Sequence, residues 1–186
     1  GHAVGCAALI DGRLLCWGTN GNGQLAPTWG EAPPASEPIA IPLPSGAPIR
    51  RVLVGAATLV LRDDGTLLSW GGNASIGRPS SLSPDPIPAP IDAKGILGVD
   101  VAHDDACLVA GGAASCWGSP LDPTTSSPLD RAIPEHVYTP EPVVDVATTR
   151  TIVVTGRTYP HRWCAVAHDG DVYCRGTNDD GQVGDG

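Results

Sequence analysis

Four copies of one short pattern constrain the fold of this chain more than any other feature of its sequence. Each copy consists of an apolar run, a turn with glycine, a second apolar run and a closing glycine, and the copies span residues 6–18, 59–71, 107–118 and 164–176. Two short apolar runs joined by such a turn are typical of a β-hairpin. Because the hairpins recur about every 50 residues, the sequence predicts a propeller or a solenoid rather than one ordinary core.

The cysteines test the strand register of these hairpins. In the first copy, a three-residue loop that ends at Gly12 places Cys6 opposite Cys16. The fourth copy has the same spacing and places Cys164 opposite Cys174. Opposed cysteines on paired strands predict a disulfide within each of these two hairpins.

The other two copies vary the pattern in an informative way. The third copy turns on residues 111–112, a two-residue glycine turn, and its cysteine spacing is also one residue shorter, so that Cys107 faces Cys116. Turn length and cysteine spacing therefore change together, which predicts three disulfides with no cysteine left over. The second copy places Leu59 opposite Ser69, so the hairpin is kept where the disulfide is absent.

The cysteines also indicate where the protein is located. Three disulfides imply an oxidising compartment, and we therefore expect an extracellular or cell-surface protein. Six free, buried thiols are the alternative interpretation. A metal site is disfavoured, because the chain has no Cys-x-x-Cys and no histidine placed to complete a tetrahedral ligand set. The chain begins within a repeat and without methionine, so we expect a mature product or a fragment.

An aromatic residue follows the second strand's cysteine, or the serine in its place, in three of the hairpins. Trp17, Trp70 and Trp117 occupy this position, and each faces a small residue in the inferred register. In the fourth copy the aromatic residue changes strands, and Trp163 faces Arg175, a pairing suited to a cation–π contact. We expect these five residues to fill one packing slot between blades, and a binding role for the aromatics is the alternative.

Three proline-rich connectors, residues 27–48, 79–90 and 120–142, separate the hairpins. Their prolines disfavour helix and remove backbone donors, so we expect ordered, extended crossovers from one hairpin to the next blade. A β-branched run precedes every hairpin except the first. We expect one domain of four repeats, approximately residues 1–48, 49–94, 95–141 and 142–186.

The fourth repeat carries extra residues between its β-branched run and its hairpin. Residues 152–154 are predicted to form a strand and residues 156–162 a loop. This loop gathers basic and aromatic side chains in an otherwise acidic chain, which makes it the candidate contact loop; a bland solvated loop is the alternative. Its candidate contact residues are Arg157, Tyr159, His161 and Arg162.

Composition and motifs narrow the possible functions. Eleven basic against twenty acidic residues give a net charge of −9, which disfavours nucleic acid and anionic membranes as partners. No apolar run is long enough for a membrane helix. We expect no cofactor and no enzymatic activity, because His168 and His103 lie in predicted turns and no catalytic motif is present. Residues 178–181 resemble a calcium loop without its distal glutamate, and residues 73–75 form a glycosylation sequon.

The repeats resemble those of the regulator of chromosome condensation family. The family hallmark combines a Cys/Ala-Ala-Leu run, Asp-Gly, Trp-Gly, Asn and Gly-Gln-Leu-Gly. The first repeat shows it at residues 6–9, 11–12, 17–20 and 23–25, and the fourth at residues 164–166, 169–170, 176–178 and 181–184. The paired cysteines resemble the secreted bacterial branch of this family.

This resemblance implies an all-β, propeller-type repeat of about four blades. Because the family's propellers usually have seven blades, the chain is expected to be incomplete as a closed ring on its own. It would then be a fragment of a longer propeller, an unusually small ring, or a unit whose ends join other copies. The end blades would expose sheet edges unless covered. The chain starts with a hairpin that lacks its preceding strands and ends where the next connector would begin, which favours the third outcome, head-to-tail assembly into a ring or a filament.

Family members include a nucleotide exchange factor, chromatin binders and a secreted inhibitor of β-lactamases, and no single activity transfers to this chain. We expect a non-enzymatic extracellular structural or protein-interaction repeat whose partners are proteins, most of all further copies of itself. A secreted inhibitor or recognition module that binds another protein through one rim is the alternative.

Overall fold

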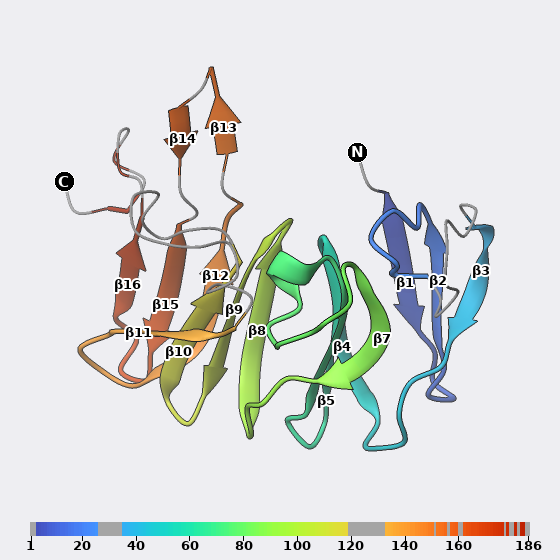
Figure 1. Cartoon of the computed structure of the whole chain (residues 1–186). Coiled ribbons are helices and arrows are strands. Elements are labelled where there is room, and N and C mark those ends of the chain that lie inside the picture. The colour runs from blue at the N-terminus through green and yellow to red at the C-terminus, as the bar shows by residue number, and fades with distance from the viewer. Residues whose placement is uncertain are drawn as a thin grey trace.

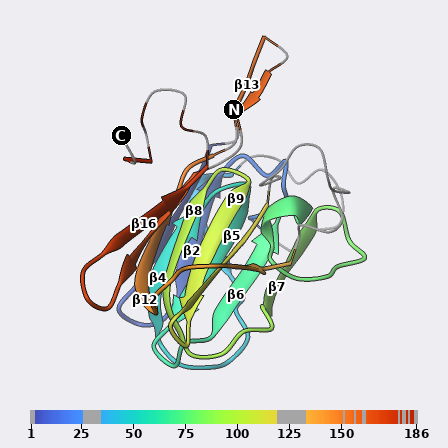
Figure 2. The same cartoon turned by 90° about the vertical axis from the view of Figure 1, so that its left-hand side faces the viewer.

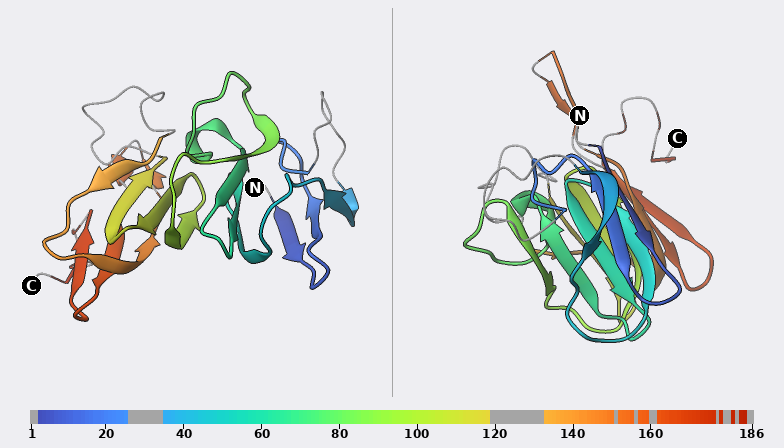
Figure 3. Two further views of the ribbon diagram at one scale, coloured as in Figure 1. Left: turned by 90° about the horizontal axis from the view of Figure 1, so that it is seen from below. Right: turned by 90° about the vertical axis from the view of Figure 1, so that its right-hand side faces the viewer.

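β-Sheets make up nearly all of the regular structure in the computed structural model of the chain. The structure describes residues 3–25, 35–118, 133–150, 152–155, 157–159, 162–176, 178, 181 and 183–184. Within them, four antiparallel sheets stand side by side as blades, with one separate two-stranded ribbon (Figure 1). Seen from below, the blades follow an open arc with blades 1 and 4 at its ends (Figure 3). The predicted all-β, four-bladed repeat is confirmed.

The strands follow chain order within each blade. Blade 1 contains β1 (Val4–Ala8), β2 (Leu14–Gly18) and β3 (Ala35–Ile41). Blade 2 contains β4 (Ile49–Val54), β5 (Ala57–Arg62), β6 (Leu67–Gly71) and β7 (Asp85–Pro90), with the short 3₁₀ helix η1 (Asn73–Ser75) after β6. Blade 3 contains β8 (Ile96–Ala102), β9 (Asp105–Ala110), β10 (Ala113–Trp117) and β11 (Glu135–Val137). Blade 4 contains β12 (Val143–Thr148), β15 (Trp163–Ala167) and β16 (Val172–Arg175). The ribbon consists of β13 (Ile152–Val154) and β14 (Arg157–Tyr159).

The hairpin registers agree with those derived from the cysteine spacing. Cys6 pairs with Cys16 across β1 and β2, and Leu59 pairs with Ser69 across β5 and β6. Gly12 ends the first three-residue loop with a φ of 87°, a left-handed conformation that favours glycine. The other two hairpins also keep their predicted pairs, Cys107 with Cys116 and Cys164 with Cys174.

The hydrophobic core is divided into three layers, each between two adjacent blades. The layer between blades 1 and 2 includes Leu14 and Trp70, and the layer between blades 2 and 3 includes Leu61 and Trp117. The layer between blades 3 and 4 includes Trp163. Because each blade buries its faces only against its neighbours, this is the repeat-type core that the sequence predicts. No helix among the described residues is long and apolar enough to span a membrane.

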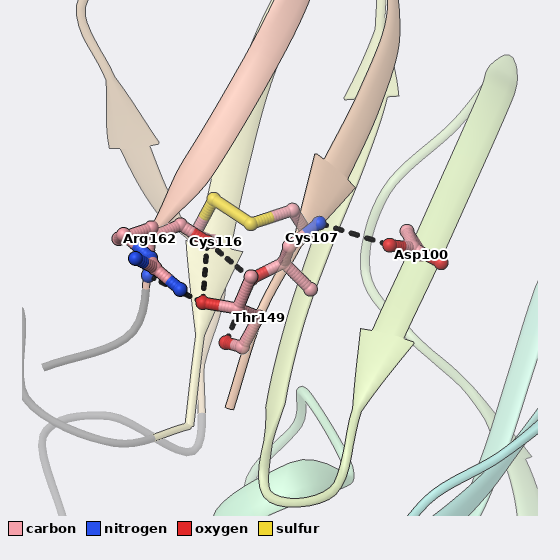
Figure 4. Close-up of a disulfide and its surroundings, with 6 residues drawn as sticks. Asp100, Cys107, Cys116, Thr149 and Arg162 are labelled. Carbon is pink, nitrogen blue, oxygen red and sulfur yellow. Dashed lines mark hydrogen bonds between the residues drawn. A yellow bond between two sulfur atoms is a disulfide. The ribbon is translucent and has the colours of Figure 1, made fainter. Parts of the chain in front are cut away.

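Hydrogen bonds between neighbouring blades fix their relative position. The Ala56 amide donates to the His103 carbonyl (2.7 Å), which ties blade 2 to blade 3. The Thr148 amide donates to a carboxylate oxygen of Asp100 (2.9 Å), which ties blade 4 to blade 3 (Figure 4). The first bond joins the turns after β4 and β8, and the second joins β12 to β8, so blades 2, 3 and 4 are linked in sequence.

The proline-rich connectors are not only crossovers, because parts of them form outer strands of the blades. Strand β7 lies within the predicted connector 79–90, and it is the edge strand of blade 2. Its residues Pro86, Pro88 and Pro90 lack backbone donors, which an edge strand tolerates on the side that has no neighbour. Strands β3 and β11 likewise fall within the other two connectors.

A largely shielded arginine joins β7 to β6 through its side-chain donors. The Arg78 guanidinium donates to the backbone carbonyls of Ser69 (3.1 Å) and Ile87 (2.9 Å) and to the Asp85 carboxylate (2.8 Å). Asp85 also accepts hydrogen bonds from the Ser80 hydroxyl and the Ile87 amide. The Arg78 and Asp85 side chains are 11% and 5% exposed, so this ion pair is largely shielded from water.

Candidate interaction surface

Three disulfides lie within the hairpins. Their Cα atoms are 4.0–4.1 Å apart, and the described residues contain no free cysteine. Each disulfide lies on the blade face that points toward the next blade, an arrangement that register alone did not reveal. Cys16 packs in the same cluster as Trp70 of blade 2, and Cys107 and Cys116 pack in the same cluster as Trp163 of blade 4. The Cys164–Cys174 bridge of blade 4 is half-buried and faces away from blade 3.

The disulfides predict a definite labelling pattern. Native protein treated with an alkylating reagent should carry no label, and full reduction under denaturing conditions should expose all six cysteines. Under mild reduction of dilute native protein, Cys164 and Cys174 should be labelled before Cys107 and Cys116, which are 0% and 2% exposed. Peptide mapping by mass spectrometry checks the order. Bonds that link different blades, or free thiols in native material, would contradict the pairing.

The tryptophans occupy equivalent positions on their blades but differ in what covers them. Trp70 is fully buried against blade 1, and its indole N–H donates to the Gln24 carbonyl (2.8 Å). Trp117 is buried against blade 2, and its indole N–H donates to the Ser75 carbonyl (2.8 Å). In both cases the loop that follows the preceding blade's repeat hairpin, β1–β2 or β5–β6, supplies the acceptor.

The remaining members of the predicted packing slot behave differently. Trp163 is 2% exposed against blade 3, and its indole nitrogen has no acceptor among the described residues. Arg175 faces Trp163 in the register but is exposed, and the cation–π contact between them stays a prediction. Trp17 is 37% exposed and covers Gly5 on the outer face of blade 1, where no described blade lies against it. A Cβ at Gly5 would lie 2.8 Å from the Trp17 ring, so a larger residue there would have to displace the ring.

The loop after Trp-Gly is built by an asparagine whose role sequence reasoning missed. The Asn20 side-chain oxygen accepts a hydrogen bond from the Leu25 amide (2.8 Å), which folds the loop back on itself. The buried Gln24 then donates across the blade boundary to the Thr58 hydroxyl (3.0 Å). In blade 4, Asn178 accepts from the Val183 amide (2.9 Å) in the same way. Asn178 thus organises a structural loop, and the signal for this was its equivalence to Asn20 in the repeat alignment.

The candidate contact loop is partly a strand, which corrects the prediction for residues 156–162. Strand β13 is where the sequence predicts it, but Arg157–Tyr159 pair with it as β14. Val154 pairs with Arg157, so only two residues link the strands, and Thr155 has a φ of 49°, as a tight hairpin turn requires. The β13–β14 ribbon projects from the end of blade 4 in two perpendicular views (Figures 1 and 2).

The proposed contact residues are only partly within the described structure. The backbones of Arg157 and Tyr159 lie in β14, and His161 is outside the described residues. Arg162 is half-buried at the base of the ribbon, where its carbonyl accepts from the Thr149 amide (2.8 Å) and its amide donates to the Thr149 hydroxyl (2.9 Å; Figure 4). The ribbon is therefore an insertion closed at its base by the pairing of Thr149 with Arg162.

A pocket of about 260 Å³ opens on the outer face of blade 4. It is below the ~300–1,000 Å³ of typical small-molecule sites, so it has the size of a receptacle for a side chain. Exposed valines extend the apolar face around it: Val166 is 38% and Val172 59% exposed. The pocket is lined by Ala147, Thr148, Thr149, Arg162, Trp163, Cys164 and Val183.

The residues weighed as catalytic or metal-binding lie in exposed turns. His103 pairs with Asp104 at 2.8 Å in the turn between β8 and β9, with both side chains about half exposed (52% and 44%). His168 lies in the hairpin turn between β15 and β16. No group of three or more His, Cys, Asp or Glu side chains among the described residues is arranged to hold a metal ion. The sequon nitrogen of Asn73 is already bound, because it donates to the Leu82 carbonyl (2.6 Å).

Comparisons with known sequences identify several relatives of the chain. No family model matches the chain. The human E3 ubiquitin-protein ligase HERC2 is 27% identical over 197 residues, which cover 100% of this chain and 4% of HERC2. The mitochondrial RCC1 domain-containing protein RUG3 of Arabidopsis thaliana is 30% identical over 141 residues, which cover 72% of this chain and 30% of RUG3. The chain thus spans only a small part of these curated relatives.

Solved structures share the fold of the chain. Human WBSCR16 has a TM-score of 0.72 at 17% sequence identity, over 99% of this chain and 48% of that one. Prp20p of Saccharomyces cerevisiae has a TM-score of 0.69 at 18% identity, over 97% of this chain and 43% of that one. Together with the names of the relatives, these neighbours support RCC1-like repeats, and they show that the four blades have the same fold as part of an RCC1-like propeller.

Proposed function

We propose that this chain is a non-enzymatic, extracellular structural or protein-interaction repeat that assembles head-to-tail with further copies of itself. The observation that carries this proposal is the state of the two end blades. Trp17 on blade 1 and the Val166 and Val172 side chains on blade 4 are all partly exposed, on faces whose internal equivalents are buried against a neighbouring blade. Covering such faces removes apolar surface from water, which favours association.

The solved neighbours support a protein as the partner. The description of the Prp20p structure names binding to Gsp1p and histones, and a second structure contains Kap60 bound to yeast RCC1. We carry over to this chain one property, the use of a rigid propeller surface to bind other proteins. We do not extend the identity of those partners to this chain.

The disulfides support the extracellular location. All six cysteines pair within hairpins at disulfide distance, and such bonds persist in oxidising compartments. We include in the proposal that the chain comes from the secreted, cysteine-paired bacterial branch to which its repeats bear resemblance. A nuclear or cytosolic setting would keep these thiols reduced.

A second candidate function is recognition of a different protein through one rim. The β13–β14 ribbon favours it, because this insertion projects beyond the stack and leaves its strand edges outside the blades (Figure 2). A free strand edge can pair with an extended segment of another chain. In that case the ribbon, and not the end faces, would form the contact.

Sedimentation velocity over a range of protein concentrations tests the proposal. We expect species larger than one copy that grow with concentration, and negative-stain images of rings or filaments. A matched variant joins Thr149 to Arg162 by a short Gly-Ser turn and so removes the ribbon at its closed base. Assembly should persist in this variant. A wild-type chain that stays monomeric at its highest soluble concentration contradicts self-assembly, and assembly lost with the ribbon contradicts assembly through the end faces.

A further inference from the structure

The contact between successive blades follows one rule at two internal junctions. At each junction, a tryptophan of the later blade packs on the face of the earlier blade. Its indole N–H donates to a carbonyl in the loop that follows the earlier blade's repeat hairpin (β1–β2 in blade 1, β5–β6 in blade 2), from Trp70 to Gln24 and from Trp117 to Ser75 (both 2.8 Å). At the first junction, Leu25 of the same loop packs in the cluster that contains Trp70.

Each end blade presents one half of this contact. On blade 1, Trp17 faces Gly5 in the register just as Trp70 faces Thr58, so its ring lies on the face opposite to blade 2. This ring is 37% exposed, whereas Trp70 is 0% exposed. Blade 1 therefore carries the tryptophan of a junction whose earlier blade is not among the described residues.

Blade 4 presents the other half. Its pocket is lined by Val183 and Cys164, which correspond in the repeat to Leu25 and Cys6. Leu25 and Val183 have the same local structure, because each backbone amide donates to the side chain of the loop asparagine (2.8 and 2.9 Å). At the junction of blades 1 and 2, Leu25 belongs to the same buried cluster as Trp70, and Cys6 packs against this cluster. The pocket on blade 4 thus lies where the tryptophan of a following blade would pack.

We infer that Trp17 of one copy inserts into the pocket beside Cys164 and Val183 on blade 4 of the next copy. This inference rests on the proposed self-assembly and specifies its contact. A second copy is the occupant that the geometry favours, because it offers the tryptophan, its flanking glycine and the curvature of the blade stack together. The contact is heterologous, so each copy inserts its Trp17 at one end and accepts the Trp17 of another copy in its blade 4 pocket at the other end.

Charge sets the conditions for the test. Each copy carries a net charge of −9, so two copies repel one another at low ionic strength. Salt screens this repulsion, with a Debye length of about 8 Å at physiological ionic strength. Assembly should therefore strengthen when salt is raised from low to physiological concentration, as expected for an apolar contact between acidic copies.

Two variants and their mixture test the contact. Trp17→Ala removes the donor and Val183→Arg places a charge in the receiving pocket, and each should weaken association about thirtyfold or more, as for a buried tryptophan anchor. Mixed in equal amounts, they should form a dimer and nothing larger. Val183→Arg keeps an intact Trp17 and Trp17→Ala keeps an intact pocket, so only one contact can form. Tyr138→Ala is the matched control, since this aromatic side chain is 75% exposed elsewhere and its loss should leave association unchanged.

A chemical readout works independently of the size measurement. The Cys164–Cys174 bridge borders the pocket, so docking of Trp17 should protect it from a thiol reductant. In the wild type, its reduction should slow severalfold as protein concentration rises. In Trp17→Ala it should not depend on concentration. Thermal melts of dilute samples confirm that both variants are folded.

The outcomes separate this inference from the proposed function. A wild-type chain that is monomeric under all conditions overturns both. Assembly that survives Trp17→Ala, or a mixture of the two variants that stays monomeric while both are folded, overturns the tryptophan contact and leaves self-assembly by another surface standing. Dimer formation restored only in the mixture supports the inference.

Discussion

Replacing Arg78 by alanine should lower the free energy of unfolding by about 3–5 kcal/mol, because it leaves a buried carboxylate without its counterion. The Arg78 guanidinium joins β6 to β7 through Ser69 and Ile87 and pairs with Asp85, which has a side chain only 5% exposed. The prolines of β7 have no backbone N–H group with which to replace these donors. Chemical denaturation monitored by tryptophan fluorescence measures the loss.

Matched variants separate this effect from the loss of any arginine. Arg50→Ala removes an exposed arginine of β4 and should change stability by no more than about 0.5 kcal/mol. Arg78→Lys keeps the charge but not the planar set of donors, so we expect an intermediate loss. Equal effects of Arg78→Ala and Arg50→Ala would show that the buried ion pair contributes little.

The same ion pair should make stability depend on pH. Burial opposes ionisation of Asp85, but hydrogen bonds from the Ile87 amide, Ser80 and Arg78 outweigh it, and the pKa of Asp85 is lowered. A carboxyl group with a lowered pKa stabilises the fold above its unfolded pKa of about 3.9 and loses this contribution as pH falls through the folded pKa. The stability difference between wild type and Asp85→Asn should therefore be large at neutral pH and shrink in acid.

Replacing Trp70 by alanine should destabilise the chain by about 3–5 kcal/mol through the cavity that it leaves between blades 1 and 2. Trp70 is 0% exposed, and it also satisfies the Gln24 carbonyl. Trp70→Phe keeps most of the apolar ring but leaves that carbonyl without its donor, so an intermediate loss is expected. Thermal and urea unfolding of dilute protein measure both variants.

Trp17→Ala is the matched control for this prediction. Trp17 has the same place in its hairpin but is 37% exposed, so its loss should cost a dilute monomer about 1 kcal/mol or less. Low protein concentration matters, since association of the wild type would add to its apparent stability. If Trp17→Ala and Trp70→Ala were equally destabilising, the blade junctions would not determine stability as the buried surface indicates.

Sequence reasoning succeeded where one local feature determines another. The pairing of Cys107 with Cys116 was predictable because turn length fixes which residues of a hairpin are opposed, and the shorter turn at 111–112 came with shorter cysteine spacing. The fold class followed from the same repetition.

The remaining features depend on partners far away in the chain. The sequence predicts a loop where β14 lies, because residues 157–159 have no strong apolar alternation and form a strand only by pairing with β13. Gln24 reaches Thr58 across a blade boundary, a contact 34 residues apart that no local pattern encodes. Likewise, the exposure of Trp17 depends on which blade lies beside it, although its hairpin position matches that of Trp70. The candidate surface was therefore only partly predictable.

Each disulfide lies within a single hairpin, and this has a mechanical consequence. Each bridge spans only nine or ten positions of the chain, and none crosses from one sheet to another. When the molecule is pulled at its two ends, its sheets should therefore unfold one after another. Each disulfide-closed loop should keep roughly 30 Å of contour length from extending. The disulfides limit the length of the fully extended chain, but they do not make the sheets unfold together.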